Sequence, residues 1–145
     1  MTEAKKVPWH LWVVGVIALL WNAYGGYDYY MTMTQGEAYM AASGLSPELI
    51  AYYGGFPDWM AGVWAVGVWI GVLGAVLLLL RMNWAVYAFF VSLAAFLVSV
   101  VYTYVLSGGA AIVGQQGMIM SAIIGAAALF FLWYAARMQK RHVLH

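Results

Sequence analysis

Long stretches without charge dominate the chain and predict its architecture. No Asp, Glu, Lys or Arg occurs in residues 7–27, 59–80 or 82–136. At about 1.5 Å rise per residue, roughly 20 helical residues cross the roughly 30 Å hydrocarbon core of a bilayer. The last stretch is long enough for two crossings, with Ser-Gly-Gly at 107–109 as the turn between them. The pattern therefore predicts four membrane-spanning helices near residues 8–32, 58–80, 83–106 and 111–137.

The loop over residues 34–56, between the first two predicted spans, carries helix signals of its own. Ser46, Pro47 and Glu48 have the order of an N-cap, a first-turn proline and an acid near a helix start, and the pair at 54–55 is Gly-Gly. We expect a short interfacial helix over residues 47–53. The chain, residues 1–145, is thus predicted to be a single transmembrane domain, an all-α integral membrane protein folded as a four-helix bundle.

The basic residues predict the orientation of this bundle. All six lie at or before the first span, between the second and third, or after the fourth: Lys5, Lys6, Arg81, Arg137, Lys140 and Arg141. Lys and Arg favour the cytoplasmic flanks of membrane helices. Four crossings place all six on one side, so both termini are expected to be cytoplasmic. The opposite side receives Asp28, Glu37, Glu48 and Asp58.

Composition narrows the function classes. Of the 145 residues 66% are hydrophobic and 8% are charged, which is far from the balance of soluble domains. The chain has no cysteine, which removes disulfides, thiolate metal sites and thiol nucleophiles. Its net charge of +1, with the basic residues spread over helix ends, indicates no nucleic-acid partner. The expected surroundings are the lipid bilayer and other membrane helices.

Small residues recur on single faces of three predicted helices. Interfaces between membrane helices favour such residues because they let two backbones approach closely. The second, third and fourth predicted spans each carry a row of small side chains at helical spacing. We expect these rows to form the contacts between helices: Gly67, Gly71 and Gly74; Ser92 and Ser99; Gly117, Ser121 and Gly125.

Polar and aromatic side chains gather where the first helix approaches its second membrane surface. Counted from Pro8 at about 1.5 Å per residue, Asn22 lies roughly 21 Å into the membrane and Asp28 roughly 30 Å. Intramembrane polar residues are candidates for function. Together with others at a similar level or deeper in the second helix, they suggest an outward-facing pocket. The candidate ligand-binding residues are Asn22, Tyr24, Asp28, Asp58, Trp64, Trp69, Gln115 and Gln116. The alternative is that the acids are solvated and Asn22 makes one hydrogen bond between helices.

No residue pattern indicates catalysis or a metal. His10 lies at the start of the first helix and His142 and His145 lie in a polar tail, so no two can ligate haem within the membrane. Metalloprotease, hydrolase, P-loop and dinucleotide motifs are missing from the sequence. We predict no catalytic residue, no metal and no resident cofactor. A flat apolar molecule such as a lipid, quinone or carotenoid could still lie against Trp64 and Trp69.

Several sequence segments together suggest a family relationship. Residues 21–32 read WNAYGGYDYYMT, residues 57–59 read PDW, and residues 64–69 read WAVGVW ahead of Arg81. This series resembles a group of small four-helix proteins of the proteobacterial inner membrane, sometimes given the automatic label "sugar transporter". The resemblance implies an inner-membrane location and four-helix topology. The group has no settled activity, so the resemblance does not suggest any enzyme activity for this chain.

Two functions of different classes follow from these features. The first is a non-catalytic small subunit or oligomeric scaffold within the bilayer, in a homo-oligomer or a larger membrane complex. The alternative is a binder or carrier of a small or lipophilic molecule, held in an outward-facing pocket near Asn22 and Asp28. Four helices are few for alternating access, so a carrier would require an assembly of at least two chains.

Overall fold

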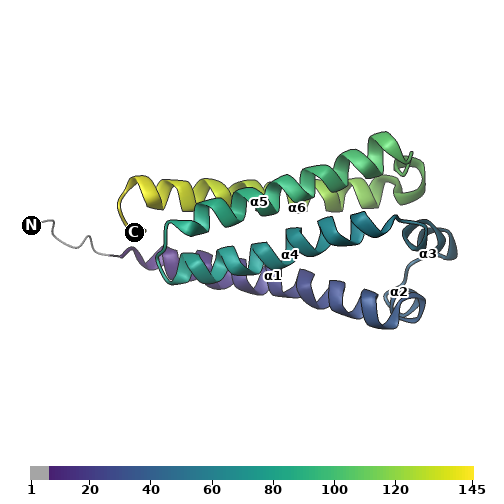
Figure 1. Cartoon of the computed structure of the whole chain (residues 1–145), viewed down its shortest axis with the longest axis horizontal. Coiled ribbons are helices and arrows are strands. Elements are labelled where there is room, and N and C mark those ends of the chain that lie inside the picture. Colours follow the sequence, from purple (N-terminus) through teal and green to yellow (C-terminus); the bar gives the residue numbers. More distant parts are fainter. Residues whose placement is uncertain (1–6) are drawn as a thin grey trace, which may run out of the picture.

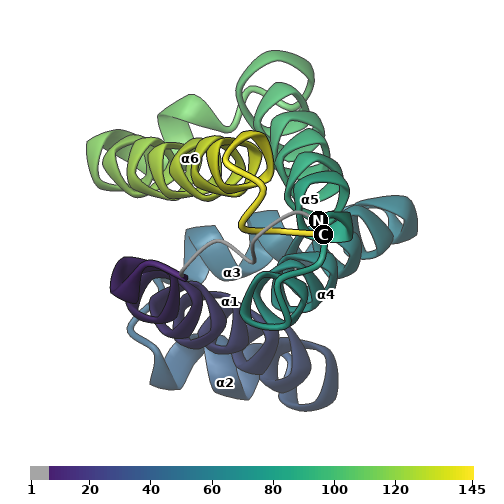
Figure 2. The same cartoon turned by 90° about the vertical axis from the view of Figure 1, so that its left-hand side faces the viewer.

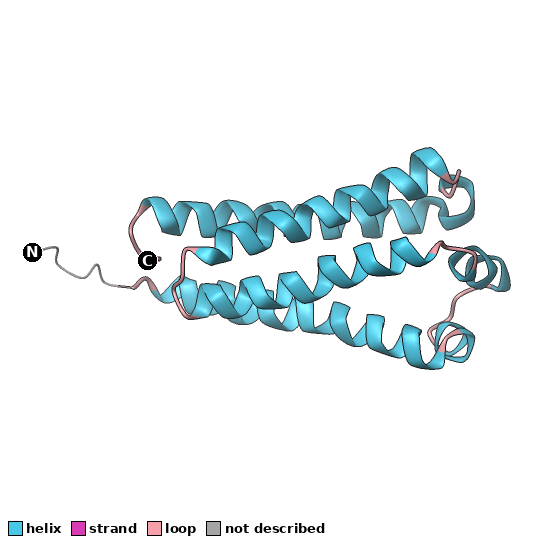
Figure 3. Cartoon of the chain, viewed as in Figure 1, coloured by secondary structure: helices cyan, strands magenta, loops and turns pink. Residues whose placement is uncertain are grey.

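The computed structural model describes residues 7–145, which are helical over most of their length (Figure 3). Long helices run side by side along the longest axis of the molecule (Figure 1). They are α1 (Trp9–Gln35), α4 (Asp58–Leu79), α5 (Trp84–Val101) and α6 (Ala110–Lys140). Shorter elements are α2 (Glu37–Ala42), α3 (Pro47–Gly54) and the π-helical segment Tyr102–Leu106, which continues α5.

The bundle has two chemically different ends. One end, called the α3 end here, carries α2, α3 and the turn between α5 and α6 (Figure 1). The other, the C-terminal end, carries the start of α1, the turn between α4 and α5, and the end of α6. The described acidic residues lie toward the α3 end and the described basic residues toward the C-terminal end. Lys5 and Lys6, on which the predicted orientation also depends, fall outside the described residues.

Three helical segments are long and apolar enough to cross a membrane: Asp58–Leu79, Trp84–Leu106 and Ala110–Lys140. The first of the four predicted spans is not among them. Its helix α1 has 27 residues, which is long enough, but His10, Asn22 and several Trp and Tyr side chains lower its hydropathy. Of the four predicted spans, the structure therefore supports three on length and composition.

Neighbouring helices pack in the order α1, α4, α5 and α6, with α4 in contact with both α1 and α5 (Figure 2). At the C-terminal end α6 also contacts α1, through a hydrogen bond between His10 Nδ1 and the Tyr134 hydroxyl group. Leu11 of α1, Leu78 of α4, Phe89 of α5 and Phe131 of α6 belong to one buried cluster at this end. Side chains from all four long helices thus meet at the C-terminal end.

Several boundaries differ from the sequence-based expectation. α1 runs to Gln35, and the short helix α2 follows in the loop where only one helix was expected. α3 occupies the expected position with one extra residue, and the Ser46 hydroxyl group accepts a hydrogen bond from the Leu49 backbone N–H at 3.2 Å. α6 is interrupted at Gly114, whose φ of 67° and ψ of −168° are accessible only to glycine. A hydropathy pattern contains no signal for such a break.

The segment after α6, residues 141–145, folds back under the bundle instead of forming the polar tail that its charges suggest (Figure 2). Val143 and Leu144 are each only 3% exposed. The backbone N–H of His145 donates to the carbonyl of Arg81 at 2.9 Å, and that of Asn83 donates to the carbonyl of His145 at 3.1 Å. The segment therefore covers the apolar cluster and fastens the turn between α4 and α5.

Candidate functional site

Asn22, the deepest polar candidate, points from α1 into α4. Its Nδ2 group donates a hydrogen bond to the carbonyl of Ala18 in its own helix at 2.8 Å. Its amide oxygen lies against Gly71, where a Cβ atom would overlap it. Gly71 is buried and Asn22 is half-buried. Asn22 therefore packs into a notch in α4 that only glycine can leave open. Its hydrogen bond stays within α1, so the alternative expectation of a hydrogen bond between helices is wrong in that respect.

Ser92 of α5 approaches the same notch from the other side. Its hydroxyl group donates a hydrogen bond to the carbonyl of Gly67 in α4 at 2.6 Å, and its Oγ lies 3.2 Å from the position of a Cβ on Gly71. Asn22, Gly67, Gly71 and Ser92, named here the polar layer, thus connect three helices. Within the bilayer, hydrogen bonds between helices are worth about 0.6 kcal/mol on average.

Loss of the Ser92 hydroxyl group is expected to weaken this layer modestly. We expect Ser92→Ala to lower the free energy of unfolding by about 0.6 kcal/mol, because the bond between α4 and α5 is lost. The matched control is Ser99→Ala, since the Ser99 hydroxyl group bonds only to Ala95 in its own helix at 3.2 Å. Denaturant unfolding of both variants in one detergent measures the difference. Equal losses would contradict a role for Ser92 between helices.

The remaining small residues divide between contacts to other helices and contacts within their own. Gly74 of α4 faces Phe89 and Ala88 of α5, and Gly125 of α6 faces Phe96 of α5. The Ser121 hydroxyl group shares a hydrogen bond of 2.8 Å with the Tyr104 hydroxyl group. Gly117, by contrast, faces Val113, which lies on the other side of the break in α6. The rows on α4 and α6 therefore serve contacts inside one chain at most of their positions.

Asp28 is held by the helix that the sequence did not predict. The Tyr39 hydroxyl group of α2 donates a hydrogen bond to Asp28 Oδ1 at 2.8 Å. The ring of Tyr39 also meets that of Tyr27 edge-on, with 6.4 Å between the ring centres. Asp28 is half-buried, so the α1 carboxylate is partly covered by α2. This contact fixes α2 against the last turns of α1.

The Asp28 carboxylate changes the titration of its partner. The pKa of Tyr39 is raised above its usual 10.0, first because its hydroxyl group donates to Asp28 and then because burial and the nearby negative charge disfavour the phenolate. A raised pKa in the folded state means that the contact stabilises the fold below about pH 10 and is lost as the pH rises through the folded-state pKa.

Difference spectrophotometry can isolate this titration. Subtracting the tyrosinate absorbance of Tyr39→Phe from that of the parent protein gives the curve of Tyr39, and its midpoint is expected above 10.0. In an Asp28→Asn background the midpoint should fall, because the hydrogen-bonding carboxylate is gone. A midpoint that does not respond to Asp28→Asn would contradict the contact.

The two deep tryptophans share one neighbour on α1. The ring of Tyr29 meets that of Trp64 edge-on at 5.1 Å between centres and that of Trp69 at 6.4 Å. Gly26, one turn earlier on α1, lies directly against the Trp69 indole. Edge-to-face aromatic pairs contribute about 0.5–1.5 kcal/mol beyond the burial of their area. Trp64 and Trp69 thus contribute to packing α1 on α4.

The other candidate residues lie outside these contacts. Asp58, Gln115 and Gln116 are exposed at the α3 end, and Tyr24 is 70% exposed on α1. Asn22 and Asp28, expected in one pocket, contact different elements, α4 and α2. The structure thus brings Trp64 and Trp69 together around Tyr29. Ligand binding at the remaining candidates stays a prediction.

The contact that fastens α3 was not predicted from the sequence. The Tyr52 hydroxyl group shares a hydrogen bond of 2.6 Å with Ser107 Oγ in the turn before α6. Edge-to-face contacts continue from Tyr52 to Phe56, from Phe56 to Tyr102, and from Tyr102 to Trp59. The sequence signals for this contact were the aromatic residues of the loop before α4 and the small residues of the turn before α6. Aromatic composition alone does not say which turn such a loop contacts.

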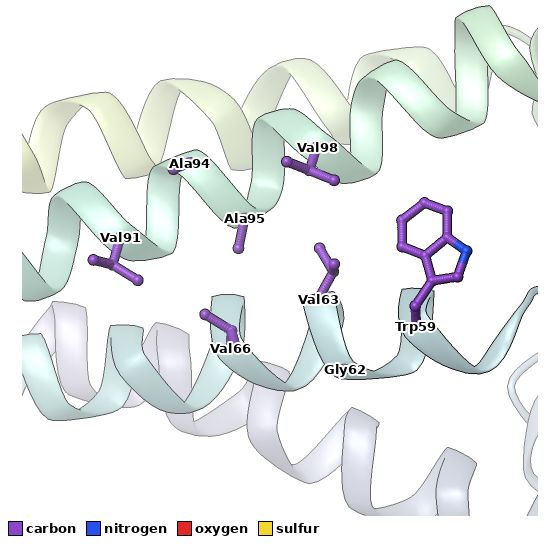
Figure 4. Close-up of a pocket in the computed structure, with 8 residues that line it drawn as sticks. All are labelled: Trp59, Gly62, Val63, Val66, Val91, Ala94, Ala95 and Val98. Atoms are coloured by element: carbon purple, nitrogen blue, oxygen red, sulfur yellow. The ribbon is translucent and has the colours of Figure 1, made fainter.

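A groove lies between α4 and α5 toward the α3 end and is named here the α4–α5 groove (Figure 4). Its volume is about 520 Å³, and its lining side chains are apolar. It lies between helices that are long and apolar enough to cross a membrane. Trp59 stands at the end of the groove nearest to α3, and Val66 and Val91 stand at the other end (Figure 4).

Neither a metal site nor a known relative identifies the function of this chain. Among residues 7–145 no group of three or more His, Cys, Asp or Glu side chains is placed to hold a metal ion. Comparison of the chain with protein-family models, curated proteins and solved structures found no match. The resemblance to small proteobacterial inner-membrane proteins stays a prediction.

Proposed function

We propose that this chain is a non-catalytic integral membrane protein that acts as a small subunit or oligomeric scaffold within the bilayer. The observation that carries the proposal is that the deep polar side chains contact neighbouring helices of the same chain. Asn22 and Ser92 are engaged in contacts among α1, α4 and α5. A substrate pathway through the bundle would instead need polar groups that face a cavity.

The outward faces of the bundle support the same proposal. Large apolar side chains remain exposed along every long helix, among them Leu20 of α1, Leu73 of α4, Leu97 of α5 and Ile119 of α6. In water such a continuous apolar surface would drive aggregation, whereas in lipid it meets hydrocarbon or other helices. Most of the exposed surface is thus suited to contacts within the bilayer.

A fourth crossing by α1 is part of the proposal. At about 1.5 Å per residue its 27 residues extend about 40 Å, which exceeds the hydrocarbon thickness. α1 packs along α4, and its polar Asn22 faces inward. Four crossings, together with the basic C-terminal end, support an orientation with the C-terminal end in the cytoplasm. The bacterial inner membrane is proposed as the location from the resemblance to small proteobacterial membrane proteins.

The absence of cysteine makes the topology directly testable. A single cysteine at Ser43, between α2 and α3, should react in intact cells with a maleimide that cannot cross the inner membrane. A single cysteine at Lys140, at the end of α6, should react only after the membrane is permeabilised. Because α4, α5 and α6 by themselves place Ser43 and Lys140 on opposite sides, a third single cysteine at Val7, before α1, tests the fourth crossing. It should react only after permeabilisation, and reaction in intact cells, as expected at Ser43, would contradict a bundle in which α1 spans the membrane.

Assembly is the direct test of the scaffold function. The protein should be extracted with its surrounding lipid by an amphipathic polymer, without detergent, and examined by native mass spectrometry. We expect a defined oligomer or co-release with other membrane chains. A protein that is released only as a monomer, over a range of expression levels that includes the native one, would overturn the proposal.

A further inference from the structure

We propose that the α4–α5 groove binds one acyl chain of a phospholipid whose headgroup carries an amine, with the Asp58 carboxylate facing the ammonium group at the α3 end. The inference rests on the proposed function only for the placement of the bundle in a membrane. It does not depend on whether the protein forms an oligomer.

Gly62 leaves open space in the α4 wall of the groove. A Cβ atom at Gly62 would meet no heavy atom within 4 Å, whereas Gly71 and Gly74, farther along the same helix, face side chains of other helices. On α5, Val98 lies closest to the level of Gly62, and the small side chains of Ala94 and Ala95 lie farther along the groove, toward the level of Val66 (Figure 4). The α4 wall extends from Trp59 to Val66, which is about 10 Å of helix.

A hydrocarbon chain is the occupant that fits these walls. An unfilled groove loses dispersion contacts on its walls, and a flexible acyl chain from the bilayer restores them. The lining of the groove is apolar, and the groove lies between two helices that are apolar enough to cross a membrane. The acyl chains of the bilayer therefore reach it directly, and a second copy of this protein is the competing occupant that the experiment distinguishes.

The acidic charge at the α3 end of the bundle selects the headgroup. Asp58 is exposed at the start of α4, immediately before Trp59 of the groove wall. The other acidic residues described, Asp28, Glu37 and Glu48, lie toward the same end, whereas the described Lys and Arg residues lie toward the opposite end. This field attracts an ammonium group and repels a headgroup with net negative charge. The Trp59 ring, which is 51% exposed, adds a face for a cation.

Lipid titration followed by native mass spectrometry tests this site. The probes are phosphatidylethanolamine and phosphatidylglycerol with identical acyl chains, added to the delipidated protein in the same detergent. We expect the first phosphatidylethanolamine to bind more tightly than the first phosphatidylglycerol. In Asp58→Asn the preference should fall by about threefold, which is the range of a solvent-exposed ion pair.

A second variant tests the acyl-chain part of the site. Gly62→Leu places a side chain in the groove and should weaken the first binding step for both lipids by about tenfold. Its matched control is Ala122→Leu, which adds a similar side chain at an exposed position of α6 and should leave that step unchanged. Thermal melting of each variant shows that the fold is retained, as the open space at Gly62 requires.

The outcomes separate this inference from the scaffold function, because the same spectra report lipid adducts and oligomers as different masses. Equal binding of both lipids by the parent protein, or equal effects of Gly62→Leu and Ala122→Leu, would overturn the lipid site and leave assembly untouched. Dissociation of an oligomer by Gly62→Leu, without weaker lipid binding, would assign the groove to a second copy and likewise overturn the proposal.

Discussion

Gly71→Leu is expected to lower the free energy of unfolding by about 3 kcal/mol, at the upper end of the usual range for overpacking. The substituted side chain would occupy the space of the Asn22 amide and press on Ser92. α1 and α5 would then have to move away from α4, and the polar layer would lose its contacts. Denaturant unfolding in detergent, followed by circular dichroism, measures the loss.

Gly62→Leu is the matched control for this prediction. Both residues are glycines of α4, Gly62 one turn from its start and Gly71 past its middle, and the substitution adds the same side-chain volume at each. Only Gly71 has neighbours in the space that the new side chain would fill. A comparable loss of stability in both variants would contradict the arrangement of α1, α4 and α5 around Gly71.

Leu144→Asp is expected to lower the free energy of unfolding by about 2 kcal/mol. Leu144 is 3% exposed within the apolar cluster at the C-terminal end, and burial of a leucine side chain contributes about 1.5–3 kcal/mol. A carboxylate cannot remain there without a partner, so residues 141–145 would leave the bundle. The backbone bonds from His145 to the turn at Arg81 and Asn83 would break with them.

Limited proteolysis measures this release. Trypsin cleaves after Lys140 and Arg141, which precede the buried segment, and cleavage should be faster in Leu144→Asp than in the parent protein. His145→Asp is the control, because it introduces the same charge at the neighbouring, exposed position. Similar cleavage rates in the parent protein and Leu144→Asp would show that the segment is not held in place.

The two largest effects lie at different depths of the same bundle. In the interior, Gly71 has no side chain and so leaves room for Asn22 and Ser92 to pack against α4. At the C-terminal end, the Leu144 side chain is buried in the apolar cluster and covers it. Neither position carries a reactive group, and both serve contacts within the chain. This division agrees with the proposed scaffold, in which the interior is structural and the apolar exterior meets lipid and partner helices.

Local rules explain what could be predicted from the sequence. The positions of the long helices follow from charge-free stretches, since a charged side chain in hydrocarbon is costly and a helix satisfies its own backbone. The short helix after Ser46 follows from capping chemistry in adjacent residues. Even so, helix α1 contains no membrane-length stretch as apolar as those of the other three long helices, because Asn22 and its aromatic neighbours interrupt it.

The candidate site was predicted less completely than the helices. Depth along a helix placed Asn22 within the bundle, and spacing placed Gly67, Gly71 and Gly74 on one face. The partners of these residues depend on the rotation of each helix about its own axis, which periodicity does not supply. Asp28 shows the limit most clearly, because its partner Tyr39 belongs to α2, a helix without a capping or hydropathy signal.

By itself the sequence determined an all-helical chain, three segments suited to crossing a membrane, and the separation of acidic from basic residues along them. Each of these depends on side chains near one another in the sequence and on the thickness of the bilayer. Only the tertiary structure decided that Asn22 enters the notch at Gly71, that Leu144 is buried, and that Gly62 opens a groove. Those features require surfaces that are distant in sequence to fit one another, and steric fit between distant surfaces is settled only when the helices pack.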